Sequence, residues 1–209
     1  MSPPVSPVRL DSPVNLPNKL TVSRMVLTVL FLAVMFTGFR GYESVAVALM
    51  WLAAITDYLD GSIARRRGLI TNFGVLMDPL ADKILTCSAF IAFIEPRLIE
   101  PWVVIIIVAR ELAITGLRLL AASQNVILAA ERFGKHKTAW QLTTIISILT
   151  MLGYTQWGVV GEFIFGWHLF GVPWIVRFAE LSKWITVALT LVSGSVYLWR
   201  NRALYLQDM

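Results

Sequence analysis

The sequence has few charged residues and almost no cysteine. Only 15% of its 209 residues are charged, and Cys87, its one cysteine, stands in an apolar run. An average soluble domain carries about 25% charged residues. A single cysteine excludes an intrachain disulfide and a cysteine-based metal site. Residues 1–17 lack the apolar core of a secretory signal and are rich in Pro and Ser, so we expect a disordered or juxtamembrane lead-in.

Apolar residues, by contrast, are abundant and come in long blocks. They make up 57% of the chain, and the mean hydropathy is +0.70. About 20 apolar residues in a helix cross the hydrocarbon core of a bilayer. Six blocks approach that length: 22–39, 45–64, 73–94, 102–122, 139–157 and 179–199. We therefore expect an all-α integral membrane bundle of about six transmembrane helices, with residues 18–209 as one membrane domain.

The apolar segment 158–178 is interrupted by four glycines and by Pro173. Glycine and proline weaken a continuous helix. We expect a loop or a short hairpin in the membrane interface, where Trp167 and Trp174 serve as anchors.

The basic residues follow the segments between apolar blocks. The formal net charge is +5, but a nucleic-acid binder gathers its basic residues on one solvated face. Here Lys and Arg concentrate at 9–24, 65–67, 132–137 and 200–202. This pattern disfavours nucleic acid and indicates contact with anionic lipid head groups and phosphate-bearing substrates. The same bias predicts that both termini lie in the cytoplasm. We therefore expect a multi-pass protein of the inner membrane whose site faces the cytoplasm.

Four aspartates lie inside two neighbouring apolar blocks. Asp57 and Asp60 are three apart, Asp78 and Asp82 are four apart, and both spacings put a pair on one helix face. Because the connection 65–72 is short, we expect adjacent antiparallel helices whose four carboxylates converge near the cytoplasmic surface. Like charges at one place repel. Hard divalent cations, Mg²⁺ or Mn²⁺, suit such a set of oxygens.

These residues also carry a resemblance. The stretch D-Y-L-D-G-S-I-A-R from Asp57 to Arg65, followed by Gly74, Asp78 and Asp82, resembles the signature of the CDP-alcohol phosphotransferases. The family also has six spans with cytoplasmic termini, and a homodimer is typical of it. The resemblance implies an enzyme that moves a phosphatidyl group from a cytidine nucleotide to an alcohol. The alternative is that the aspartates form structural ion pairs with Arg65, Lys83 or Arg110.

The resemblance also implies a role for each motif residue. Asp57, Asp60 and Asp78 would hold two metal ions, and Asp82 would complete the second metal site and act as the catalytic base. The implied donor-binding residues, for CDP-diacylglycerol, are Asn18, Thr21, Gly61, Ala64, Arg65, Thr71 and Gly74. For Asn18, Thr21 and Thr71, helix capping is an alternative to ligand contact.

A second group of residues indicates the acceptor. The stretch from Arg110 to Arg118 and the element G-K-H-K-T, which contains Lys135 and Lys137, resemble the phosphatidylglycerophosphate synthase branch of the family. Arg binds phosphate through two parallel hydrogen bonds and Lys through a point charge. We expect these four residues to bind the phosphate of glycerol 3-phosphate. Glu111 should point about 100° away from Arg110 around the helix, so that it would not be the partner of that arginine.

The sequence also allows other interpretations of these residues and of the acceptor. One alternative is that these four basic residues only reflect the excess of positive charge that membrane proteins carry on their cytoplasmic side. Within the family, the acceptor could be inositol phosphate, serine or phosphatidylglycerol, although serine carries no phosphate. A small ion-coupled transporter is a further alternative, but transporters bind near the bilayer midplane between repeated, broken helices.

Overall fold

The computed structural model describes residues 16–67, 72–124, 132–202 and 204. In this part of the chain the protein is almost wholly helical. Its elements are α1 (Leu16–Thr37), α2 (Tyr42–Arg67), α3 (Asn72–Ala92), α4 (Pro101–Ser123), α5 (Arg132–Gly153), the 3₁₀ helix η1 (Tyr154–Trp157), α6 (Gly158–Phe165), the strands β1 (His168–Leu169) and β2 (Val172–Pro173), and α7 (Trp174–Arg200). The expected all-helical fold is confirmed.

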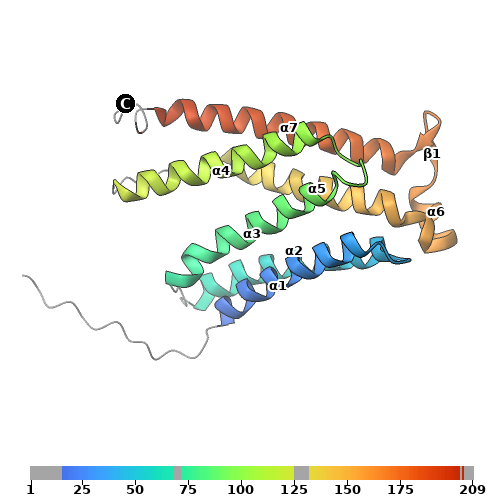
Figure 1. The fold of residues 1–209 in the computed structure, drawn as a ribbon, viewed down its shortest axis with the longest axis horizontal. Coiled ribbons are helices and arrows are strands. Elements are labelled where there is room, and N and C mark those ends of the chain that lie inside the picture. Colours follow the sequence, from blue (N-terminus) through green and yellow to red (C-terminus); the bar gives the residue numbers. More distant parts are fainter. Residues whose placement is uncertain (1–15, 68–71, 125–131, 203, 205–209) are drawn as a thin grey trace, which may run out of the picture.

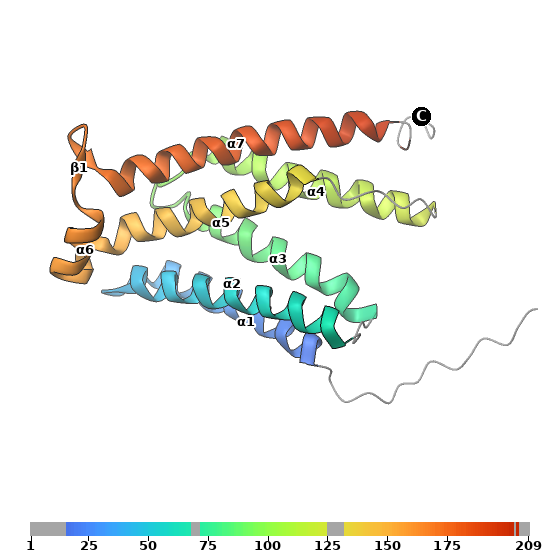
Figure 2. The same ribbon diagram turned by 180° about the vertical axis from the view of Figure 1, so that it is seen from behind.

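Six long helices run back and forth between two ends of the molecule (Figure 1). At one end α1 and α3 begin, while α2, α4 and α7 terminate; we call this the motif end, because the last turns of α2 and the first turns of α3 carry the aspartates. At the other end, the hairpin end, lie α6 and the antiparallel pair β1–β2 (Figure 2). The chain alternates as the apolar blocks predict.

The helices extend beyond the apolar blocks, most clearly at the motif end. The block 45–64 lies in a helix that continues to Arg67, and the block 139–157 in one that begins at Arg132. At the C-terminal end of the block 22–39, Gly38 and Gly41, with φ of +57° and +89°, make the turn from α1 into α2. Charged residues that the sequence analysis assigns to the segments between apolar blocks therefore belong to terminal helical turns.

The segment 158–178 differs from the expected loop or short hairpin. A hairpin is present, but it occupies only 168–173; an eight-residue helix, α6, precedes it and α7 already begins at Trp174. The glycines explain the helix. Gly158 turns the chain between η1 and α6 with φ of +61°, and a Cβ on Gly161 would stand 2.0 Å from the carbonyl oxygen of Tyr154. Here glycine permits close packing and does not mark a loop.

Large side chains fill the interior between the helices. Phe31, Phe90, Phe93, Met50 and Leu149 are completely buried. The most extensive helix contacts join α5 to α7 and α1 to both α2 and α3. Two hydroxyl pairs cross the α5–α7 contact and connect buried side chains: Thr144 to Thr186 at 2.9 Å and Ser147 to Ser182 at 3.1 Å.

The exterior of the helices is strongly apolar. Val29, Ile105, Leu112, Leu119 and Trp199 are each more than half exposed. Within the described residues, one helical stretch, His136–Phe165, is long and apolar enough to cross a membrane by length and composition. Shorter apolar stretches occur at Val22–Thr37, Tyr42–Thr56 and Lys83–Ala92. The number of spans, six by the sequence, stays a prediction.

Candidate active site

The signature residues lie on the ends of two helices that meet. Asp57, Asp60, Gly61, Ala64 and Arg65 fall in the last three turns of α2, and Gly74, Asp78 and Asp82 in the first three turns of α3. Since both segments are helical, each aspartate pair shares one helix face, as the spacing predicts.

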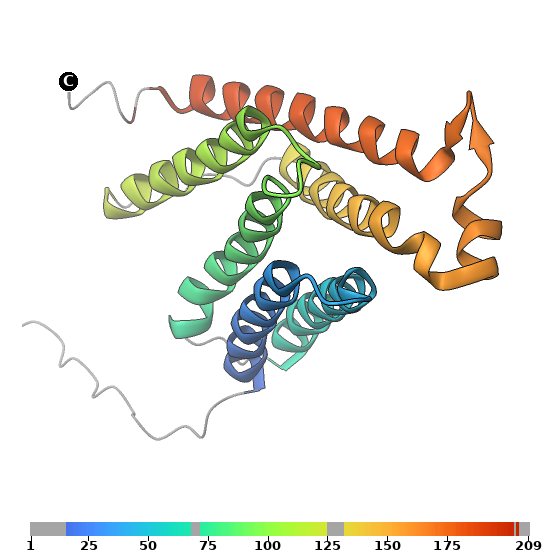
Figure 3. The same ribbon diagram turned by 45° about the vertical axis from the view of Figure 1, so that its right-hand side comes forward.

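The two helices run in opposite directions and separate as they leave the motif end (Figure 3). The expected antiparallel arrangement is thus present. Helix α1 packs extensively against both of them, and α2 also packs against α5. The first turns of α1, which carry Asn18 and Thr21, begin at the motif end too. Three helix ends therefore meet where the sequence places the donor site.

The side chains of the four aspartates lie outside the part of the chain that the structure describes, as do those of the donor-binding candidates on these helices and the whole of Thr71. Among the side chains that are described, no group of three or more His, Cys, Asp or Glu could hold a metal ion. The backbone nevertheless fits a divalent cation. It brings four carboxylate-bearing positions from two helices to one end of the molecule, and carboxylate oxygens are the donors that Mg²⁺ and Mn²⁺ prefer.

Beside this region, a buried ionic cluster joins α4 to α5. Glu111 of α4 is 6% exposed, and its Oε1 accepts hydrogen bonds from Lys137 Nζ of α5 and from Arg110 Nη1, the latter at 3.2 Å. Lys137 is 2% exposed. We call these three side chains the Glu111 cluster. The expectation that Glu111 points away from Arg110 is wrong, because the long guanidinium side chain reaches back to its neighbour.

Helix α7 holds Arg110 from its other side. Arg110 Nη2 donates to Ser193 Oγ at 3.2 Å, and a Cβ on Gly194 would stand 2.9 Å from Arg110 Cγ. The lack of a side chain at Gly194 is therefore what lets the arginine stem lie flat against α7. Two turns further along α4, Arg118 is exposed; its Nε donates to Tyr197 Oη at 3.4 Å and its guanidinium lies 5.7 Å from the Tyr197 ring centre.

A hydrogen-bond chain connects the acidic helix to this cluster. Lys83 Nζ of α3, next to Asp82 in sequence, donates to Thr115 Oγ1 of α4. Thr115 Oγ1 in turn donates to the backbone carbonyl of Glu111 at 2.7 Å. The helix that carries two of the aspartates is thus tied to the helical turn that carries Arg110 and Glu111.

Of the four expected acceptor-binding residues, three have described side chains. Arg110 and Lys137 meet at Glu111, whereas Arg118 lies apart, against Tyr197. Lys135 belongs to the first turn of α5, but its side chain lies outside the described part. The contact of Lys137 with Glu111 was not predictable, because a pair 26 residues apart on two helices has no spacing pattern.

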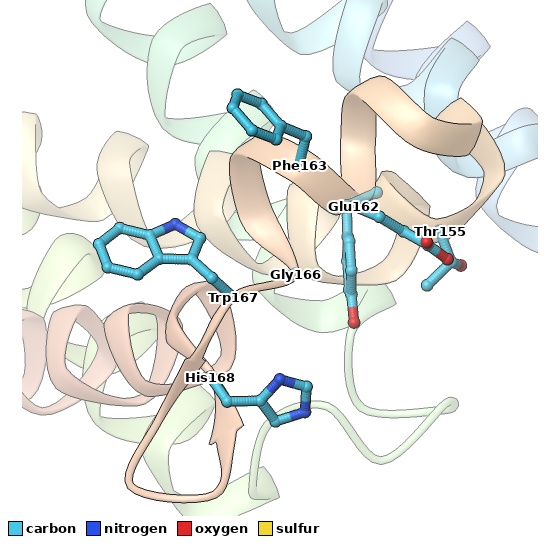
Figure 4. A pocket seen from close by; sticks show the side chains of 7 residues that line it. Thr155, Glu162, Phe163, Gly166, Trp167 and His168 are labelled. Atoms are coloured by element: carbon cyan, nitrogen blue, oxygen red, sulfur yellow. The ribbon is translucent and has the colours of Figure 1, made fainter.

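The hairpin end holds a different polar group. Lys183 of α7 lies 3.0 Å from Glu100 Oε2 and 2.8 Å from Glu180 Oε1, and we call these three the Lys183 cluster. A cavity of about 830 Å³ opens nearby, lined by residues of η1, α6 and β1 that include Glu162 and His168. Figure 4 shows that Phe163 and His168 point in opposite directions. The sequence predicts no site residue at this end.

Comparison with known proteins agrees with the signature. The family model for CDP-alcohol phosphatidyltransferase matches residues 14–192. The chain is 37% identical to the CDP-diacylglycerol–glycerol-3-phosphate 3-phosphatidyltransferase of Bacillus subtilis (strain 168), over 90% of this chain and 95% of that protein. It is 34% identical to the protein of the same name from Rickettsia felis, over 91% and 96%. A probable phosphatidylglycerophosphate synthase of Mycobacterium tuberculosis is 41% identical over 63% of this chain and 64% of that protein.

The chain belongs to the CDP-alcohol phosphatidyltransferase family. It is therefore a transferase of phospholipid biosynthesis. This membership confirms the family resemblance of the motif from Asp57 to Asp82. It also excludes the alternative interpretation of the aspartates as the cation site of an ion-coupled transporter.

Proposed function

We propose that this chain transfers the phosphatidyl group of CDP-diacylglycerol to sn-glycerol 3-phosphate, forming phosphatidylglycerophosphate and CMP. Two relatives whose sequences align with nine tenths of this chain carry that reaction in their names. The observation that carries the proposal is the position of Arg110, Arg118 and Lys137. They stand on helices next to the acidic motif, and a phosphorylated acceptor is stabilised by several cations there.

The metal site is assigned to Asp57, Asp60, Asp78 and Asp82, which together would hold two Mg²⁺ or Mn²⁺ ions. Bound there, the ions would neutralise the donor's diphosphate and the charge that develops on CMP. The donor nucleotide and diphosphate are assigned to the ends of α1, α2 and α3: Asn18, Thr21, Gly61, Ala64, Arg65, Thr71 and Gly74.

In the reaction, Asp82 accepts the proton of the acceptor's hydroxyl group. The hydroxyl oxygen forms a bond to the phosphorus that bears diacylglycerol, and the bond from that phosphorus to the oxygen shared with CMP breaks. CMP leaves with the electron pair. A general base of this kind contributes roughly 10²–10⁴-fold to the rate.

The acceptor is held through its phosphate by Arg110, Arg118, Lys135 and Lys137. Charge-assisted hydrogen bonds to phosphate contribute about 1.5–3 kcal/mol each. Serine, which has no phosphate, would leave these cations without an anion. Inositol phosphate and phosphatidylglycerol do carry phosphate and are therefore the acceptors against which glycerol 3-phosphate must be compared.

We further propose that the six long helices span the inner membrane, with the motif end in the cytoplasm, and that the chain works as a homodimer. The alternation of the helices and their apolar exterior support the spans. The basic residues of α2, α5 and the end of α7, all near the motif end, support the orientation.

The test is an acceptor comparison with the purified chain in detergent. CDP-diacylglycerol is supplied with glycerol 3-phosphate, serine, inositol phosphate or phosphatidylglycerol, and the release of CMP is measured. We expect rapid release with glycerol 3-phosphate alone. Turnover with serine and none with glycerol 3-phosphate would refute the proposal.

A further inference from the structure

Glu111 is a buried acidic residue of α4 that lies outside the metal motif. Its carboxylate is 8% exposed and contacts two cations, Arg110 and Lys137. Buried carboxylates are costly unless they are paired and hydrogen-bonded. Here both partners come from the set that the sequence assigns to the acceptor's phosphate.

The helical turn around Glu111 is fixed from three sides. Lys137 connects it to α5, Arg110 connects it through Ser193 to α7, and Thr115 connects it to Lys83 of α3. Thr115 also donates to the Glu111 carbonyl. The carboxylate is thus held in place by the fold before any substrate binds.

We infer that Glu111 is the positioning residue of the acceptor site: it holds the side chains of Arg110 and Lys137 together so that both can bind one phosphate. This inference rests on the proposed function. Two cations that are held at one carboxylate lie close enough together for the three oxygens of a single phosphate group to contact both side chains. Without the carboxylate the two cations repel each other and lose their common geometry.

The role predicts an effect on the acceptor and not on the donor. In Glu111→Gln we expect the KM for glycerol 3-phosphate to rise roughly ten- to a hundred-fold, the loss of one charge-assisted hydrogen bond to the phosphate. The KM for CDP-diacylglycerol should stay within about twofold of wild type, because the donor is assigned to the ends of α1–α3. In Glu111→Asp, which keeps the charge but has a shorter reach, we expect an intermediate acceptor KM.

The matched control is Glu100→Gln. It removes a carboxylate from the other buried lysine, Lys183, at the hairpin end. We expect unchanged KM values for both substrates, even where the thermal midpoint falls. A merely structural role for Glu111 would make Glu111→Gln behave like this control.

The outcomes are distinguishable. If wild type releases no CMP with glycerol 3-phosphate, the proposed function fails. If wild type does, but Glu111→Gln keeps the wild-type acceptor KM or raises both KM values equally, the inference alone is overturned. Should Glu111→Gln not accumulate as folded protein, Glu111→Asp decides: a wild-type acceptor KM in that variant overturns the inference.

Discussion

Two lysines among the described side chains are almost fully buried, and their surroundings are opposite. Next to the motif end, Lys137 and Arg110 share the single carboxylate of Glu111. At the hairpin end, Lys183 alone faces two carboxylates, Glu100 and Glu180, whose side chains are 47% and 54% exposed.

Under the proposed function, this difference separates a cluster that binds the acceptor from one that contributes to stability. The spare negative charge of the Lys183 cluster reaches water, where it costs little. In the Glu111 cluster two cations meet at one buried carboxylate. Under the proposed function, the acceptor's phosphate is a further anion for these two cations. Changes at the motif end should therefore alter turnover, and changes at the hairpin end should alter only stability.

The largest effect is expected at the acidic motif. Asp57→Asn should abolish transfer, because one lost carboxylate unbalances the proposed pair of divalent cations. CMP release by the purified variant is the measurement, and excess chelator should abolish the activity of wild type in the same assay. Glu162→Gln, which changes a carboxylate at the hairpin end, is the control and should retain full activity. Activity of Asp57→Asn equal to wild type would remove this residue from the site.

A smaller but still large effect is expected from Asp82→Asn. As the proposed base, Asp82 should contribute roughly 10²–10⁴-fold to kcat. The donor KM should change less. Steady-state kinetics with CDP-diacylglycerol as the varied substrate measures both constants. A collapse of donor affinity with kcat preserved would make Asp82 a binding residue and not the base.

A substitution of Arg118 tests the proposed acceptor-binding residues without changing the Glu111 cluster. Arg118→Ala should raise the acceptor KM roughly ten- to a hundred-fold through the lost charge-assisted hydrogen bond and leave the donor KM nearly unchanged. Tyr197→Phe is the matched control, since it removes only the hydroxyl that Arg118 contacts. Equal changes in the KM of both substrates for Arg118→Ala would mean that the arginine acts by general electrostatics.

The smallest effect is expected at the hairpin end. Lys183→Met removes a pair with half-exposed carboxylates, worth about 1 kcal/mol. The apparent melting midpoint in detergent should fall by roughly 2–4 °C, with both KM values unchanged. A changed acceptor KM would break the division between the two ends.

The same variant should also respond less to acid. The hydrogen bond from Lys183 holds the pKa of the Glu100 carboxyl below its ordinary value of 4.5. A lowered pKa stabilises the fold above the ordinary value, and this stabilisation is lost as the pH falls through the lowered pKa. The wild-type midpoint should therefore drop more steeply in acid than that of Lys183→Met, which is measured by melting at a series of pH values.

Helices that rest on long apolar blocks were predictable from the sequence, and so was their alternation between two ends. Apolar length alone determines both. The segment from Gly158 was not, since glycine weakens helices in general, whereas Gly161 is required for α6 to pack against η1. The extensive packing of α1 against both α2 and α3 was not predictable either, because a short connection fixes where two helices meet but not which other helix packs against them.

The site divides in the same way. The spacing of Asp57, Asp60, Asp78 and Asp82 predicts shared helix faces, and the helices are present. The partners of Arg110 and Lys137 were not predictable. Residue 111 lies 100° around the helix from residue 110, but a flexible side chain spans that angle, and only the packing of α4 on α7 and α5 brings the cations together.

The two hydroxyl pairs between α5 and α7 have a consequence for how the protein opens. Thr144 pairs with Thr186 and Ser147 with Ser182, so a slip of one helix along the other would break both buried hydrogen bonds between the helices at once. The two pairs thus fix the register of α5 against α7. Any rearrangement that admits a bulky lipid donor should then move α1, α2 and α3 against an α5–α7 unit that stays rigid.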